Sequence, residues 1–104
     1  FKNIDLRVAE IVAAEPIKNS QKLLKIIVRA PEERVIVAGI AEHYRPAELP
    51  GRQVIIVANL KPAKLMGVAS QGMVLAAKEV DADGNERLVL STVAGDIAPG
   101  ARVA

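Results

Sequence analysis

Val54-Ile55-Ile56-Val57-Ala58 is apolar at five consecutive positions, and the polar segment that follows it, Asn59 to Gly72, ends where a second apolar run begins at Met73. Short runs of β-branched and aliphatic residues between Pro, Gly, Asn and Asp are typical of β-strands. Followed outward in both directions, the same pattern predicts six strands, over residues 6–12, 23–28, 35–40, 54–60, 73–77 and 88–90.

The connections between these runs are short. Asp81-Ala82-Asp83-Gly84-Asn85 separates the last two runs and predicts a β-hairpin, because Asp, Gly and Asn tolerate the positive φ of a tight reversal. Residues 41–49 are the only candidate helix, and Pro46 and Pro50 limit that helix to a turn or two.

The whole chain, residues 1–104, is predicted to be one domain, since 104 residues with 51% hydrophobic content suit one small core. Six short strands and one short helix favour an all-β fold, a five-stranded OB-fold barrel with one short helix and a C-terminal extension. The lack of long helices argues against a βαβ fold. No apolar run approaches the roughly 20 residues that a membrane-spanning helix needs, so we expect no membrane association.

Two of the predicted strands are apolar on both faces. Val54–Ala58 and Val35–Ala38 lack polar alternation, whereas a barrel interior covers only one face of a strand. A second copy of the chain would cover the other face, so we expect a homodimer with an interface near residues 6–11 and 97–103. Loops that fold back over the barrel explain the same pattern equally well.

The residues that usually carry catalysis are scarce. The chain has no cysteine, one histidine, His43, and three serines, so it offers no thiolate metal site and no convincing Ser-His-acid triad. Its seven glycines do not fall in the spacing of a phosphate or dinucleotide loop. We therefore expect no enzyme activity, no metal and no cofactor, and the absence of cysteine suits a reducing cytoplasm.

The charges are segregated along the chain. Residues 16–31 and residues 49–78 each contain four basic side chains and no acidic one, although the net charge of the whole chain is only +2. If folding brings these two windows together, they form a basic face of the kind that attracts phosphates. Solvated lysines on exposed strands are the plainer explanation, and charge alone favours that explanation.

The segment from Asn59 to Met73 is the best candidate for binding. Lys61 and Lys64 supply cations, Asn59 and Ser70 supply an amide and a hydroxyl, and phosphate and ribose oxygens accept hydrogen bonds from such groups. Gly67 and Gly72 would let another backbone come close. The alternative is a turn-rich loop whose polar groups satisfy local backbone atoms and whose methionines, Met66 and Met73, lie in the core.

Aromatic residues are nearly absent. Phe1 and Tyr44 are the only two, so binding of single strands by successive base stacking has almost no platform. A nucleic-acid partner would be recognised mainly through its phosphates and its overall shape.

Several motifs together resemble one family. The resemblance covers nearly the whole chain and is most specific from Asn59 to Met73. The motifs are Asp5-Leu6-Arg7-Val8, Lys22-Leu23-Leu24-Lys25, Val37-Ala38-Gly39-Ile40 with Tyr44, Asn59-Leu60-Lys61-Pro62-Ala63-Lys64 with Gly67, and Ser70-Gln71-Gly72-Met73. They are similar to the tRNA-binding barrel domains, which include the C-terminal domain of bacterial methionyl-tRNA synthetases and stand-alone dimeric tRNA-binding proteins.

The resemblance implies a homodimeric OB-fold domain that binds tRNA by shape, with little regard to the anticodon. Because the chain starts at Phe1, we expect it to be the excised C-terminal domain of a methionine–tRNA ligase, in which catalysis belongs to a separate domain. By matching position, the resemblance implies that the RNA-binding residues are Lys22, Lys25, Asn59, Lys61, Lys64, Ser70 and Met73.

Two positions depart from the family pattern. Arg29 stands where relatives often have an acidic residue, and Ala38 stands where they often have Ser. Arg29 would add positive charge to an RNA face, whereas Ala38 removes a hydroxyl that could bind a partner. The alternatives that remain are a stand-alone tRNA-binding protein and a dimeric protein, similar to secretion chaperones, that binds unfolded peptides.

Overall fold

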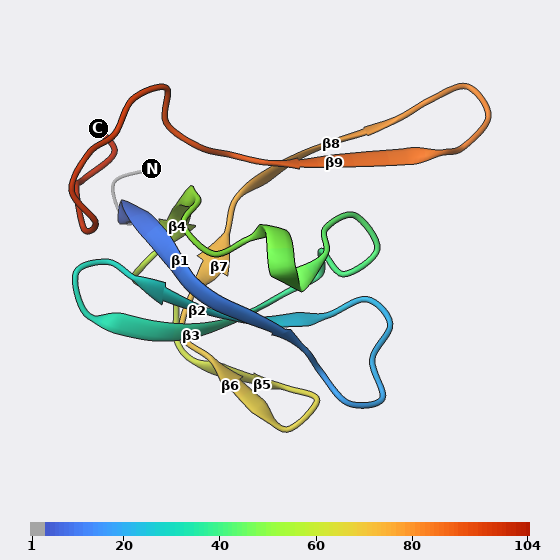
Figure 1. Ribbon diagram of the computed structural model, residues 1–104, viewed down its shortest axis with the longest axis horizontal. Helices are drawn as coiled ribbons and strands as arrows, with labels where there is room; N and C mark the ends of the chain where they lie inside the picture. The colour runs from blue at the N-terminus through green and yellow to red at the C-terminus, as the bar shows by residue number, and fades with distance from the viewer. Residues whose placement is uncertain (1–3) are drawn as a thin grey trace.

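A computed structural model describes residues 4–104 and shows nine strands and one short 3-10 helix in this part of the chain (Figure 1). In chain order the elements are β1 Leu6–Pro16, β2 Leu24–Arg29, β3 Glu33–Ala38, η1 Pro46–Glu48, β4 Gln53–Val57, β5 Ala63–Leu65, β6 Val68–Ser70, β7 Met73–Val74, β8 Ala76–Val80 and β9 Glu86–Leu90. The all-β prediction is confirmed.

A five-stranded antiparallel sheet in the order β3-β2-β1-β4-β7 forms the wall of the barrel. The long strand β1 pairs with β4 through residues 6–10 and with β2 through residues 10–16. A register shift between Ile11 and Ala13 interrupts the β1–β2 pairing. Such an irregularity increases bend and twist, which a sheet needs to curl on itself.

Residues 70 and 71 join the two edges of this sheet. The Gln71 N–H donates to the Val35 carbonyl at 2.7 Å, and the Val35 N–H donates to Gln71 Oε1 at 2.9 Å. The Val37 N–H donates to Ser70 Oγ at 2.9 Å. These bonds bring strand β3 to the chain just before β7, so the five-stranded barrel is nearly closed, as the sequence predicted.

The core is aliphatic and receives residues from each long barrel strand. Its largest fully buried side chains are Ile11, Leu24, Ile26, Val28, Ile36, Leu49, Val54 and Ile56. Leu49 comes from the predicted helical segment, which is in fact a turn after Ile40 followed by η1. The two prolines restrict this segment as expected.

The hairpin predicted at residues 81–85 is present and extends away from the barrel as the two-stranded arm β8–β9 (Figure 1). At its turn, Asp81 Oδ1 accepts hydrogen bonds from the N–H groups of Asp83 and Asn85. The run predicted over residues 73–77 is divided, because β7 ends at Val74 and β8 begins at Ala76.

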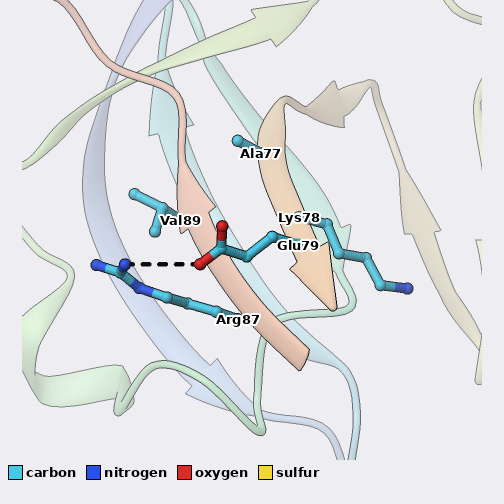
Figure 2. Close-up of a pocket in the computed structure, with 5 residues that line it drawn as sticks. All are labelled: Ala77, Lys78, Glu79, Arg87 and Val89. Carbon is cyan, nitrogen blue, oxygen red and sulfur yellow. Dashed lines mark ion pairs between the residues drawn. The ribbon is translucent and has the colours of Figure 1, made fainter. Parts of the chain in front are cut away.

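The arm has two different faces. Figure 2 shows Ala77, Val89 and the ion pair of Glu79 with Arg87 around a shallow pocket, while the Lys78 side chain extends away from that pair. Val89 remains 45% exposed. This face of the arm is therefore open and mixed, with the apolar Ala77 and Val89 beside the exposed Glu79–Arg87 ion pair.

The C-terminal segment is a true extension of the barrel. The Val8 N–H donates to the Ala101 carbonyl at 2.8 Å, and the Val103 N–H donates to the Leu6 carbonyl at 2.9 Å. The two segments predicted to form a dimer interface, 6–11 and 97–103, thus pair with each other within one chain. In residues 4–104 no helix has the length and apolar character to cross a membrane.

Candidate nucleic-acid interface

The segment Asn59–Gly72 contains a small hairpin that the sequence analysis missed. Strands β5 and β6 pair from Ala63↔Ser70 to Leu65↔Val68, and Met66 and Gly67 form the turn with φ of +52° and +80°. The pairing of Val57 with Met73 holds the two ends of the segment together. A Gly-containing pair between two short apolar stretches is a hairpin signal, but strands of three residues are too short for a pattern to stand out.

Lys61 and Lys64 lie on the approach to this hairpin and on its first strand. Both are exposed, and within residues 4–104 neither has a carboxylate partner at ion-pair distance. Lys64 pairs with Ala69 across the hairpin, so the two small strands present one cation on the face opposite Ser70. Two uncompensated cations are therefore free to meet an anionic partner.

Lys25 connects the two acid-free windows. It lies on β2 and lines a shallow groove together with Pro62, Val68 and Gln71 of the hairpin region. Its Nζ is 3.3 Å from Glu15 Oε1, so part of its charge is compensated. Residues of the two windows meet at this groove, where Lys25 is the one basic side chain of the lining. A basic face built from both windows stays a prediction. Lys22 is exposed in the connection before β2.

Ser70 and Gly72 face the protein itself. Ser70 is only 5% exposed, and its hydroxyl accepts from the Val37 N–H and donates to the Gly72 carbonyl. Gly72 has φ of +146°, and a Cβ there would lie 2.8 Å from the Val57 carbonyl oxygen. The close approach that Gly72 allows is therefore to the chain's own backbone.

Asn59 lies at the base of the hairpin, where β4 ends. Its side-chain oxygen accepts a hydrogen bond from the Asp5 N–H at 3.0 Å. The amide thus holds the entry to the hairpin against the start of the chain.

The two methionines are exposed. Met66 and Met73 each keep 53% of their surface in contact with solvent. The alternative that places both side chains in the core is wrong.

Arg34 is a residue that the sequence analysis did not single out. Its Nη1 donates to the carbonyls of Ala58 and Gln71, at 2.6 and 3.3 Å, and so holds the start and the end of the hairpin segment to β3. Nothing in the local sequence indicates this role, because both acceptors are backbone atoms more than 20 residues away.

The two departures from the family pattern have local explanations. Arg29 pairs with Glu10 at 2.9 Å across β1 and β2, so its charge is compensated within the chain. Ala38 is buried in the barrel core.

The described residues also bear on stacking and on metal binding. The Tyr44 hydroxyl accepts from the Leu90 N–H, and the Arg52 guanidinium lies 5.5 Å from the ring centroid. Tyr44 thus joins the arm to the barrel.

Over residues 4–104 no group of three or more His, Cys, Asp or Glu side chains has the arrangement of a metal site.

Comparison with known families identifies the fold's relatives. A model of the family described as "Putative tRNA binding domain" matches residues 6–102. The chain belongs to the tRNA-binding domain family. This membership confirms the resemblance carried by the motifs from Asp5 to Met73.

The relatives include a methionine–tRNA ligase from Thermotoga maritima, which is 57% identical over 104 residues. That alignment covers 99% of this chain and 16% of the ligase, so the chain spans about a sixth of the relative's length. Among solved structures, a methionyl-tRNA-synthetase-related protein from Pyrococcus horikoshii has a TM-score of 0.85 and 43% identity, with 100% of this chain and 93% of that chain covered. The CsaA chaperone from Picrophilus torridus has a TM-score of 0.83 and 28% identity, covering 100% and 94%.

Proposed function

We propose that this tRNA-binding domain holds folded tRNA through the β5–β6 hairpin and the adjoining strand β2. The observation that supports this site is the pair of uncompensated cations, Lys61 and Lys64, next to the groove that Lys25 lines. Cations of this kind neutralise backbone phosphates and release counterions, which supplies most of the affinity for nucleic acids.

The proposed RNA-binding residues divide by their surroundings. Lys22, Lys61 and Lys64 are exposed and can contact phosphates. Lys25 can contact a phosphate once its ion pair with Glu15 breaks. Met73 is exposed at the start of β7, and Asn59 lies at the base of the hairpin. Ser70 is buried, so we assign it to holding the hairpin in place for the RNA.

We propose recognition by shape because the domain has few aromatic side chains on which bases could stack. Tyr44 is half-buried and bonded to Leu90, and one such ring is no platform for a run of stacked bases among residues 4–104. Cations on the strands of a folded domain suit a folded RNA whose phosphates have fixed positions. We therefore propose binding that depends little on sequence.

The larger setting is also part of the proposal. Because the matched relatives are methionine–tRNA ligases of which this chain spans about 16%, we propose that residues 1–104 act as the non-catalytic C-terminal domain of such an enzyme, in the cytoplasm. A stand-alone tRNA-binding protein is the alternative, which the similarity to the Pyrococcus protein supports.

We further propose that the domain forms a homodimer. The observation in favour is the exposure of Val89 and Ala77 on the open face of the arm, beside the Glu79–Arg87 ion pair (Figure 2). A two-stranded ribbon is only marginally stable by itself in water, so a second copy on this face would stabilise it.

Titration of the purified domain with unfractionated tRNA at two salt concentrations tests the central proposal. We expect affinity to fall steeply with salt, and labelled tRNA to resist displacement by poly-pyrimidine single strands. Equal competition by the single strands would exclude recognition by shape. Tight, salt-insensitive binding of an unfolded peptide in place of tRNA would favour the chaperone-like alternative that the CsaA similarity raises.

A further inference from the structure

The turn of the β5–β6 hairpin has an unusual residue at its tip. Met66 and Gly67 both have positive φ, at +52° and +80°, which is the pattern of a tight two-residue reversal. Asn-Gly is the favoured pair for such a turn, because Asn tolerates the left-handed conformation that costs most other residues about 1–2 kcal/mol. Methionine at this position therefore works against the local folding preference.

The side chain at the tip has no compensating role in the core. Met66 is 53% exposed and its neighbour Leu65 is 41% exposed. In Figure 1 the turn of the hairpin lies at the edge of the molecule, while Ser70 at the end of β6 is bonded to β3. An apolar side chain in an unfavourable conformation at an exposed tip suggests a role in binding.

The surroundings of the tip indicate the chemistry of the ligand. Lys61 and Lys64 precede it, and no acidic residue occurs between residues 49 and 78. Within residues 4–104 neither lysine is neutralised by a carboxylate. An apolar tip beside uncompensated cations is complementary to a polyanion that also exposes apolar surface, and a folded RNA with an unpaired or terminal base has both.

We propose that Met66 packs its thioether against the face of an exposed base of the bound tRNA, while the lysines neutralise the neighbouring phosphates. Sulfur makes favourable contacts with aromatic rings, and Met and Leu are among the side chains that nucleic-acid-binding proteins place against bases. The tip would supply the base contact that aromatic residues supply in other barrels. This inference rests on the proposed binding of tRNA by the hairpin.

Met66→Asn tests the proposal because it should maintain or raise the thermal stability of the domain while it lowers the affinity for tRNA. Asn suits the left-handed turn, so thermal stability should be unchanged or rise by a few degrees. Without the apolar side chain at the tip, tRNA binding should weaken about four- to tenfold, with the salt slope unchanged. Met66→Leu, the matched control, should bind nearly as well as the parent domain.

Met66→Gln has nearly the shape of Met and serves as a second variant if Met66→Asn folds poorly. A long, fully paired RNA duplex should bind both polar variants as it binds the parent, because its internal bases are stacked and out of reach. Parent-like tRNA affinity in folded Met66→Asn and Met66→Gln would overturn the proposal. A weakening seen only with an unfolded peptide would assign the tip to peptides and overturn it equally.

The outcomes separate this inference from the function on which it rests. If the parent domain does not bind tRNA, or binds it with no dependence on salt, the proposed function fails. If the parent binds with a steep salt slope and the Met66 variants bind equally well, only the inference about the tip fails.

Discussion

At the scale of single residues, exposure separates side chains that meet a partner from side chains that build the surface. Lys61 and Lys64 are exposed and uncompensated among residues 4–104, whereas Ser70 is buried and fully engaged. The sequence places all three in one polar segment and does not distinguish them. The pairing of β5 with β6 puts Lys64 and Ser70 on opposite faces of the hairpin, and the Ser70 face is the one that meets β3.

Replacing Lys61 or Lys64 by Ala should change the salt dependence of tRNA binding. Removing one cation that neutralises a phosphate should reduce the slope of log affinity against log salt by about 0.7 to 0.9. Lys78→Ala is a matched control, because Lys78 belongs to the same acid-free window but pairs with Glu86 on the arm at 3.1 Å. Fluorescence titration across a salt series measures the slopes. Full slopes in both variants would place the basic face elsewhere on the barrel.

Ser70→Ala should destabilise the fold, since the buried Val37 N–H would be left without its acceptor. We expect a decrease of about 1–3 kcal/mol in the free energy of unfolding. Ser91→Ala is the control, because the hydrogen bonds found at Ser91 involve its backbone alone. Urea denaturation followed by circular dichroism gives both values. If Ser70→Ala left stability unchanged but weakened tRNA binding, the result would indicate that the hydroxyl contacts the RNA directly.

At the scale of elements, the predictable parts are those that local sequence determines. Each long strand of the barrel was predicted to within a few residues, because its apolar run is bounded by turn formers. The β5–β6 hairpin was not predicted, because each of its strands has only three residues. The charged Lys64 in the middle of β5 also interrupts the apolar run by which a strand is recognised. The break at Leu75 was not predicted either, because it depends on residues far away in the sequence. Between β7 and β8, the Leu75 N–H donates to the Ile55 carbonyl and the Leu75 carbonyl accepts from the Ser91 N–H.

The turn of the arm provides a prediction about pH. The Asn85 N–H donates to the Asp81 carboxylate and lowers its pKa. Desolvation opposes this shift, and the Asp83 N–H and the Asn85 side-chain amide lower the pKa by smaller amounts. A carboxyl whose pKa is lowered by folding stabilises the turn above its unfolded pKa, and that stabilisation disappears as the pH falls through the folded pKa. The Asn85 amide resonance should therefore shift with a midpoint below the ordinary Asp range.

Asp81→Asn should abolish this titration, because the amide has no proton to gain. NMR spectra of both proteins between neutral and acid pH provide the comparison. A midpoint for Asn85 at or above the ordinary Asp pKa would show that the turn does not depend on the ionised carboxylate.

At the scale of the whole molecule, the sequence predicted a barrel with a surface that a second copy would cover, and the place of that surface stays a prediction. Residues Ile36 to Ala38 are buried within the one chain, and the free edge of their strand is hydrogen-bonded by Ser70 and Gln71. The C-terminal segment pairs in the same way with the first part of β1. What remains open is the arm, whose exposure depends on tertiary arrangement and leaves no trace in the pattern of β8 and β9.

Self-association through the arm is the last prediction. Val89 is exposed on a solvent-facing side of the arm, so Val89→Asp should leave the barrel folded while charging the proposed interface. Ile97→Asp makes the same change in the other proposed segment, where Ile97 is also exposed. Sedimentation at micromolar concentration should give a species of twice 11.0 kDa for the parent and the monomer for Val89→Asp. Dissociation by Ile97→Asp alone would place the interface along residues 97–103 instead. A parent that sediments as one 11.0 kDa species would contradict the dimer itself, and Val89 and Ala77 would then stay exposed unless another partner covers them.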